Sequence, residues 1–283
     1  MIGPQFLFPL QEALFLSLDS AKENTLSRSS IEPAFAEMAA LNVFDANVRV
    51  GHSGIHGQLA LEAGELLEEI NHFGIEQVLV SHFTAEEYDA EEGNRALALD
   101  LEKSPDRFIP AWGALPDKAF LERLARRKPA AVRFSFGLKK HNLSYAPLYS
   151  GPLYEYLEEH SILAVIARED IEWDGLAQLL QNFPRVSFLL LETGYRAERY
   201  LDPLLKSFPR FYFDSSTLLA HRQLESFVEQ FGYERIVFGS RLPLYTPGAA
   251  LAVLGTARIS DDAKRAIAGG TLRRLLRTTS SET

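Results

Sequence analysis

Four arginines are the residues of this sequence with the clearest chemical potential, because each lies at or near the end of a short apolar run. They are Arg49, Arg133, Arg168 and Arg241. A guanidinium presents a planar set of N–H donors that matches a carboxylate or a phosphate. If any of these charges lacks an internal partner, we expect it to bind such a group on a small anionic molecule.

Acidic residues near the same run ends offer an alternative, in which the arginines are paired internally. These acids are Asp45, Glu169, Glu192 and Asp214. Complete pairing would give a buried ion network that binds no ligand. The sequence does not favour one arrangement over the other.

Glu192 is the strongest candidate for a general base, since a neighbouring arginine would keep its carboxyl ionised. A glutamate that only balances Arg49 or Arg241 would look the same in the sequence. His82 ends another apolar run and is a candidate for proton transfer, or else a residue of the rim. The stretch GHSGIHG holds two further histidines, and its glycines favour polar loop residues over a displaced metal site. Phosphate-loop, dinucleotide and serine-elbow patterns are missing from the sequence.

Eight apolar or β-branched runs alternate with stretches of helical periodicity, which is typical of parallel strands joined by crossover helices. The expected strands are Leu41 to Val50, Glu76 to His82, Phe108 to Leu115, Ala130 to Phe136, Leu163 to Arg168, Val186 to Glu192, Phe211 to Ser215 and Arg235 to Ser240. A last helix is expected from Asp261 to Arg277. The pattern predicts one (β/α)8 TIM barrel, whose binding groups lie at the carboxyl ends of the strands.

Several of these runs resemble strands of the amidohydrolase-2 family, in the same order and at similar spacing. The resembling segments are VFDANVR at 43–49, GNRAL at 93–97, RFIPAWGALPD at 107–117, LLLETGY at 189–195 and YERIVFGSRLP at 233–243. The resemblance covers about residues 41 to 277. It implies a barrel of the metal-dependent hydrolase type, with an active site at the strand ends.

The positions that hold metal ligands in the amidohydrolase-2 family differ here. By that resemblance they are occupied by Asn47, Arg49, Ala167, Glu192 and Arg241. A one-residue shift would replace Ala167 by Ile166 or Arg168. A hydrolytic zinc ion needs about three protein donors, and a guanidinium has no lone pair to give. We therefore expect no metal and no other cofactor, and assign Asn47 with the arginines to ligand binding.

The bulk composition limits the partners and the compartment. A net charge of −9 and a pI near 5.4 argue against nucleic acid and against an anionic membrane surface. The absence of cysteine excludes disulfides and thiolate sites and leaves cytoplasm as the favoured compartment. Residues 1–40 read as an amphipathic helical extension rather than a signal peptide, through which a homodimer is possible, and residues 41–283 form the barrel.

Three functional hypotheses remain open at this point. The first is an amidohydrolase-like barrel that binds a small carboxylate or phosphate without a metal. The second is a metal-independent hydrolase or lyase that uses Glu192 with Arg49 and Arg241 as electrostatic stabilisers. The third is a non-catalytic structural or regulatory partner of an active homologue.

The residues at the five ligand positions generate a prediction about metal content. We expect the purified protein to carry well under one equivalent of zinc, iron or manganese, because four of those five side chains are poor ligands or cations. A chelator should leave its melting temperature unchanged, since no bound metal stabilises the folded state. Metal analysis and melting with and without chelator measure both. Stoichiometric metal would contradict this expectation.

Overall fold

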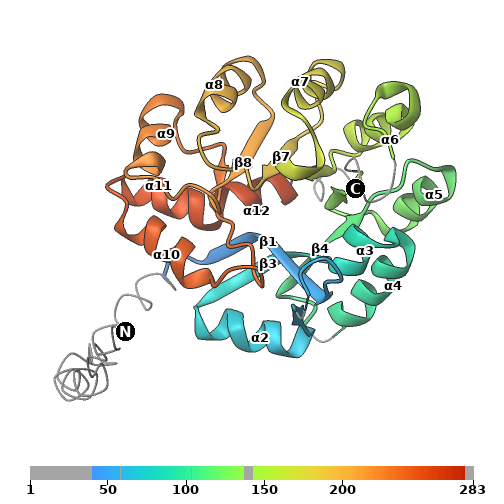
Figure 1. Ribbon diagram of the computed structural model, residues 1–283, viewed down its shortest axis with the longest axis horizontal. Coiled ribbons are helices and arrows are strands. Elements are labelled where there is room, and N and C mark those ends of the chain that lie inside the picture. Colours follow the sequence, from blue (N-terminus) through green and yellow to red (C-terminus); the bar gives the residue numbers. More distant parts are fainter. Residues whose placement is uncertain (1–39, 58, 103, 137–142, 278–283) are drawn as a thin grey trace, which may run out of the picture.

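Parallel strands alternate with helices in the computed structural model, which describes residues 40–57, 59–102, 104–136 and 143–277 (Figure 1). The strands are β1 Val43–His52, β2 Ala60–Leu61, β3 Ile75–His82, β4 Phe108–Gly113, β5 Ala131–Phe134, β6 Leu163–Ala167, β7 Phe188–Leu191, β8 Phe211–Asp214 and β9 Ile236–Val237. The α-helices are α2 Ala63–His72, α3 Phe83–Glu87, α4 Ala90–Leu101, α5 Lys118–Arg127, α6 Pro147–Glu159, α7 Trp173–Asn182, α8 Glu198–Ser207, α9 Gln223–Phe231, α10 Pro247–Thr256, α11 Asp261–Arg265 and α12 Thr271–Arg277.

The strands form a sheet that curls until its two sides meet. Among the described residues its order is β2-β1-β3-β4-β5-β6-β7-β8-β9, and β2 is antiparallel to β1. The chain after β9 lies against β1: the Ala46 N–H donates to the Phe238 carbonyl and the Arg49 N–H to the Leu242 carbonyl, each at 2.9 Å. The predicted (β/α)8 barrel is therefore confirmed, and each of the eight expected runs contains a strand.

Apolar side chains on both faces of the strands explain why these runs form a barrel. Strand β6, with the sequence LAVIA, is buried at every position, as expected for a strand with helices outside and a filled interior. The interior layer includes Phe44, Leu79 and Leu189, which belong to one cluster with Leu272 of α12. Barrel and C-terminal helix therefore share a core.

Helix α12 closes the amino-terminal end of the barrel. Arg273 donates to the carbonyl of Asn42, just before β1, at 2.7 Å, and Arg274 to that of Glu234, just before β9, at 2.8 Å. Figure 1 shows this helix lying across the middle of the ring of helices. The polar side chains that could bind a ligand lie at the opposite end of the barrel, at the carboxyl ends of the strands.

Two helices of the structure were not indicated by the sequence pattern, and the helix expected at the end of the chain is not continuous. Helix α3 is a five-residue helix that directly follows β3, too short to give a periodic signal. Helix α10, with the sequence PGAALAVLGT, is apolar on most sides and so lacks the polar face that marks a surface helix. The expected last helix is interrupted by a π-helical segment, Ala266–Gly270.

The predicted N-terminal extension lies almost entirely outside the described residues, which begin at residue 40. The amphipathic helix and the homodimer assigned to it therefore stay predictions. None of the helices in the described part combines the length and apolarity that a membrane crossing requires.

The shared core generates a stability prediction. Leu272→Ala, at a fully buried position, should lower the free energy of unfolding by about 2–5 kcal/mol because it leaves a cavity under the barrel. Leu99→Ala on α4, where the side chain is 65% exposed, is the control and should change it by about 0.5 kcal/mol or less. Denaturant unfolding measures both. Equal effects at the two positions would show that α12 does not contribute to the core.

Candidate functional site

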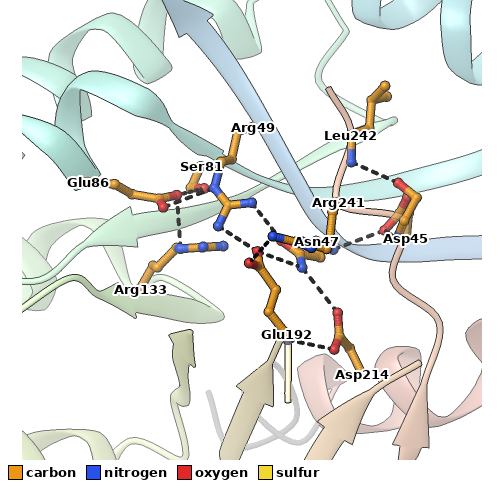
Figure 2. Close-up of polar contacts among 11 residues, drawn as sticks. Asp45, Asn47, Arg49, Ser81, Glu86, Arg133, Glu192, Asp214, Arg241 and Leu242 are labelled. Carbon is orange, nitrogen blue, oxygen red and sulfur yellow. Dashed lines mark hydrogen bonds and ion pairs between the residues drawn. The ribbon is translucent and has the colours of Figure 1, made fainter. Parts of the chain in front are cut away.

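Charged side chains from several strand ends meet in one buried cluster at the carboxyl-terminal end of the barrel (Figure 2). The cluster consists of Asn47 and Arg49 of β1, Glu86 of α3, Arg133 of β5, Glu192 after β7, and Arg241 after β9. Because the strands are parallel, their ends reach the same side of the barrel, so residues far apart in the chain become neighbours. Of the four arginines singled out in the sequence, Arg49 and Arg241 contact Glu192, Arg133 contacts Glu86, and Arg168 lies apart.

Arg49 is the best-paired cation of the cluster. Its Nε donates to Glu86 at 3.0 Å, its Nη1 to the Asn47 side chain at 3.2 Å, and its Nη2 to Glu192 at 2.8 Å. The residue is 3% exposed. Burial acts against the charge, but the two glutamates raise the pKa of Arg49 above its ordinary value. Arg49 is thus a fixed positive centre around which the other groups are arranged.

Glu192 bridges two arginines, one with each carboxylate oxygen. Oε1 accepts from Arg49, and Oε2 lies 2.9 Å from Nη2 of Arg241. Glu86 supplies a second negative charge to Arg49. Burial acts to raise the pKa of Glu192, but the arginines lower it to about 2. A carboxylate held this way is a weak base.

Glu86 is the member of the cluster that sequence reasoning missed. It accepts a hydrogen bond from Ser81, and its Oε1 forms an ion pair with Nε of Arg133 at 2.9 Å. Despite burial, Arg133 and Arg49 hold the pKa of Glu86 below its ordinary range. The stretch HFTAEE does place an acid within a few residues of the end of β3, where the arginines of adjacent strands need counter-charges.

Two buried aspartates hold the backbone around the cluster. Asp45 accepts from the N–H groups of Asn47 and Ser240, each at 3.0 Å. Asp214 accepts from the Glu192 N–H at 2.8 Å and from the Asn47 side chain at 3.1 Å. Burial raises the pKa of Asp45 from 3.8 to about 7 and that of Asp214 from 3.8 to about 6. Their charge therefore changes near neutral pH.

Three guanidinium nitrogens of the cluster form no hydrogen bond among the described residues. They are Nε and Nη2 of Arg133 and Nε of Arg241, all buried as atoms, although Nε of Arg133 lies in ion-pair contact with Glu86. Arg133 is 2% exposed, whereas the Arg241 side chain is 23% exposed and stacks at 4.7 Å over the ring of Tyr245. Arg241 is thus the cation of the cluster nearest to solvent.

Arg168 and His82 lie apart from the network. Arg168 stacks over Trp173 at 4.6 Å, donates to the carbonyl of Ile171 at 2.7 Å and lies 3.5 Å from Glu172. The Nδ1 of His82 accepts from the N–H of Thr84 at 3.1 Å, which caps α3. Burial lowers the pKa of His82. The geometry gives both side chains structural contacts, and the roles predicted for them in ligand binding and proton transfer stay predictions.

A comparison with known families decides what kind of barrel this is. The sequence model of the family described as amidohydrolase (Amidohydro_2) matches residues 61–278. The chain belongs to the amidohydrolase family. The resemblance inferred from the strand motifs is thereby confirmed. No curated protein matches this chain in sequence.

Solved structures agree on the fold of this member of the amidohydrolase family. An uncharacterised TIM-barrel protein from Bordetella bronchiseptica is 16% identical, with a TM-score of 0.68 over 84% of this chain and 99% of that chain. A 2,6-dihydroxybenzoate decarboxylase from Rhizobium is 16% identical, with a TM-score of 0.68 over 84% and 99%. A dihydroxybenzoic acid decarboxylase from Polaromonas, with bound manganese and the inhibitor 2-nitroresorcinol, is 15% identical, with a TM-score of 0.67 over 85% and 98%. At these identities the likeness concerns the fold alone.

The cluster does not fit a metal ion of the kind implied by the family. Both oxygens of Glu192 face guanidinium groups, and the side chains of Arg49 and Arg241 bring positive charge where a cation would sit. The described segments contain no group of three or more histidine, cysteine or carboxylate side chains placed to hold a metal.

The raised pKa values of the aspartates generate a prediction about pH. An acid with a higher pKa in the folded state than in the unfolded chain destabilises the fold as pH rises from its unfolded to its folded pKa. For Asp45 that window runs from 3.8 to about 7. Asp45→Asn keeps the acceptor for both backbone N–H groups and removes the titration. Its free energy of unfolding should therefore fall less than that of the wild type between about pH 5 and pH 8.

Denaturant unfolding at several pH values measures this difference. Asp202→Asn on the exposed face of α8 is the control and should keep the pH dependence of the wild type. Parallel curves for the wild type and Asp45→Asn would contradict the assigned ionisation.

Proposed function

We propose that this amidohydrolase-family barrel binds a small carboxylate or phosphate at the carboxyl ends of its strands, without a metal. The observation that carries the proposal is the pair of guanidinium donors, Arg133 Nη2 and Arg241 Nε, that lack an acceptor among the described residues. A buried donor without an acceptor costs about 1–3 kcal/mol, more for a charged group. An anion that accepts from these groups relieves that cost.

The exposure of the arginines indicates where a ligand enters. Arg49 and Arg133 are 3% and 2% exposed, whereas the side chain of Arg241 is 23% exposed. A ligand therefore meets Arg241 first, and the Tyr245 ring beneath its guanidinium holds that group in place. Decarboxylases of the same fold are known in complex with 2,6-dihydroxybenzoate and with the inhibitor 2-nitroresorcinol, and these small aromatic acids support the choice of a small acidic ligand.

The alternative of a metal-independent hydrolase or lyase rests on Glu192 as the base. Its lowered pKa and its pairing with both Arg49 and Arg241 argue against proton abstraction. We therefore do not propose a reaction.

The third hypothesis, a structural or regulatory role, has one observation in its favour. Arg49 makes contacts through all three of its nitrogens, and both carboxylates of Glu86 and Glu192 are engaged, as in a network built for stability alone. The response of the protein to anions separates this role from ligand binding.

We expect phosphate, sulfate or a small dicarboxylate to raise the melting temperature of the wild type in a saturable way. Charge-assisted contacts stabilise by about 1.5–3 kcal/mol, which corresponds to a shift of a few degrees in a chain of this size. Arg241→Gln should abolish the shift because it removes the entry cation. Arg199→Gln, at an exposed position of α8, is the matched control and should keep it.

Arg49→Ala should also abolish the shift, but it unpairs Glu86 and Glu192 as well and is the less selective change. If no anion stabilises the wild type and Arg241→Gln by itself lowers stability, the network is an internal salt-bridge structure and ligand binding is wrong.

A further inference from the structure

Glu86 sits in the network as a bound carboxylate ligand would. Its oxygens accept hydrogen bonds from Nε of Arg49 at 3.0 Å and from the hydroxyl of Ser81, Nε of Arg133 lies in ion-pair contact at 2.9 Å, and its side chain is 5% exposed. Guanidinium groups and a hydroxyl around one carboxylate are the contacts by which proteins recognise free carboxylates. In this chain the group that fills them is covalently attached.

The segment that carries Glu86 is short and is attached to a surface loop. Helix α3 has five residues, fewer than a helix needs for stability of its own. The next residue, Glu87, holds the loop between β1 and β2, because its carboxylate accepts from the Ser53 hydroxyl at 2.8 Å and from the Gly54 N–H at 2.7 Å. Because Glu86 and Glu87 are adjacent in α3, a backbone movement that withdraws Glu86 from the cluster also disturbs this contact.

Charge balance decides how a carboxylate ligand is accommodated. The described cluster has three guanidiniums, those of Arg49, Arg133 and Arg241. Its own carboxylates are Glu86 and Glu192, and the carboxyl groups of Asp45 and Asp214 lie beside it, which makes four carboxyl groups in all. With all four ionised, an added anion would enter a site that already carries excess negative charge, which is costly in a buried position. Exchange of one carboxylate for another leaves the charge unchanged.

We propose that Arg49, Arg133 and Ser81 form a carboxylate-binding site that Glu86 occupies, and that a ligand carboxylate enters by displacing Glu86 and releasing the loop held by Glu87. The proposal rests on the proposed anion binding and specifies how that anion reaches the inner arginines. Arg241 provides the first contact, and the inner pair receives the carboxylate after exchange. Glu86 is a positioning residue and an internal competitor in this arrangement.

Chemical rescue tests the site. Glu86→Ala leaves the three donors without a carboxylate, so its melting temperature should fall below that of the wild type. Formate or acetate should then raise it by several degrees in a saturable way, whereas acetamide and chloride at the same concentration should not. Glu86→Gln fills the same space with a neutral group and is the matched control, which should not respond to formate.

Rescue can still be measured if Glu86→Ala unfolds, by comparing the yield of folded protein after refolding with formate and with chloride. A higher yield with formate supports the site. Equal responses of Glu86→Ala and Glu86→Gln to formate, in melting or in refolding, would overturn it.

Hydrogen exchange in the wild type tests the displacement. Formate should speed the exchange of the amides of Gly54 and Ile55, because both donate to Glu87 in the resting structure. Unchanged exchange at saturating formate would overturn the displacement even where rescue succeeds. These outcomes are independent of the anion test of the wild type and of Arg241→Gln: a wild type that no anion stabilises, or an anion shift that persists in Arg241→Gln, contradicts the proposed function, while rescue of Glu86→Ala reports on the inner site alone.

Discussion

Arg49 and its two glutamates form the contact on which the other features of the barrel mouth depend. A buried guanidinium is stable only where carboxylates match its charge and geometry, and a partner removed from such a pair leaves an uncompensated charge. Because the partners come from α3 and from the end of β7, the pairing fixes three parts of the chain relative to one another. Arg133 forms an ion pair with Glu86, and Arg241 forms one with Glu192. Each glutamate of the network therefore contacts two arginines.

Two residues of the network have an unfavourable backbone conformation. Glu192 and Arg241 have φ values of 58° and 65°, in the left-handed region that non-glycine residues seldom adopt. Asp214 accepts from the N–H of Glu192, and Asp45 accepts from the N–H of Ser240, just before Arg241. The hydrogen bonds to the two aspartates thus help to hold the backbone at Glu192 and next to Arg241 in this conformation. This positional role explains why buried acids with raised pKa values are part of the site.

The sequence predicted the barrel well because its strands carry a strong local signal. Runs such as LAVIA and FLLL are apolar throughout, which identifies buried parallel strands. Strand ends also identified Arg49, Arg133, Arg241 and Glu192 as neighbours. Glu86 was missed because a five-residue helix has no periodicity, and nothing local shows that its acid turns inward. Arg168 was included because it follows a strand, yet stacking on Trp173 turns it aside.

The seam between β1 and the chain after β9 has a consequence for biosynthesis. Strand β1 leaves the ribosome first among the described strands, but its neighbour around Leu242 and the closing helix α12 are made last. Apart from Gly51 and His52, which pair with β2, one side of β1 therefore stays unpaired during most of translation, as an edge able to pair with other chains. The barrel can therefore close only in the final stage of synthesis. A polypeptide that ends before α12 lacks the helix that covers the apolar interior, so we expect an open sheet rather than a smaller barrel.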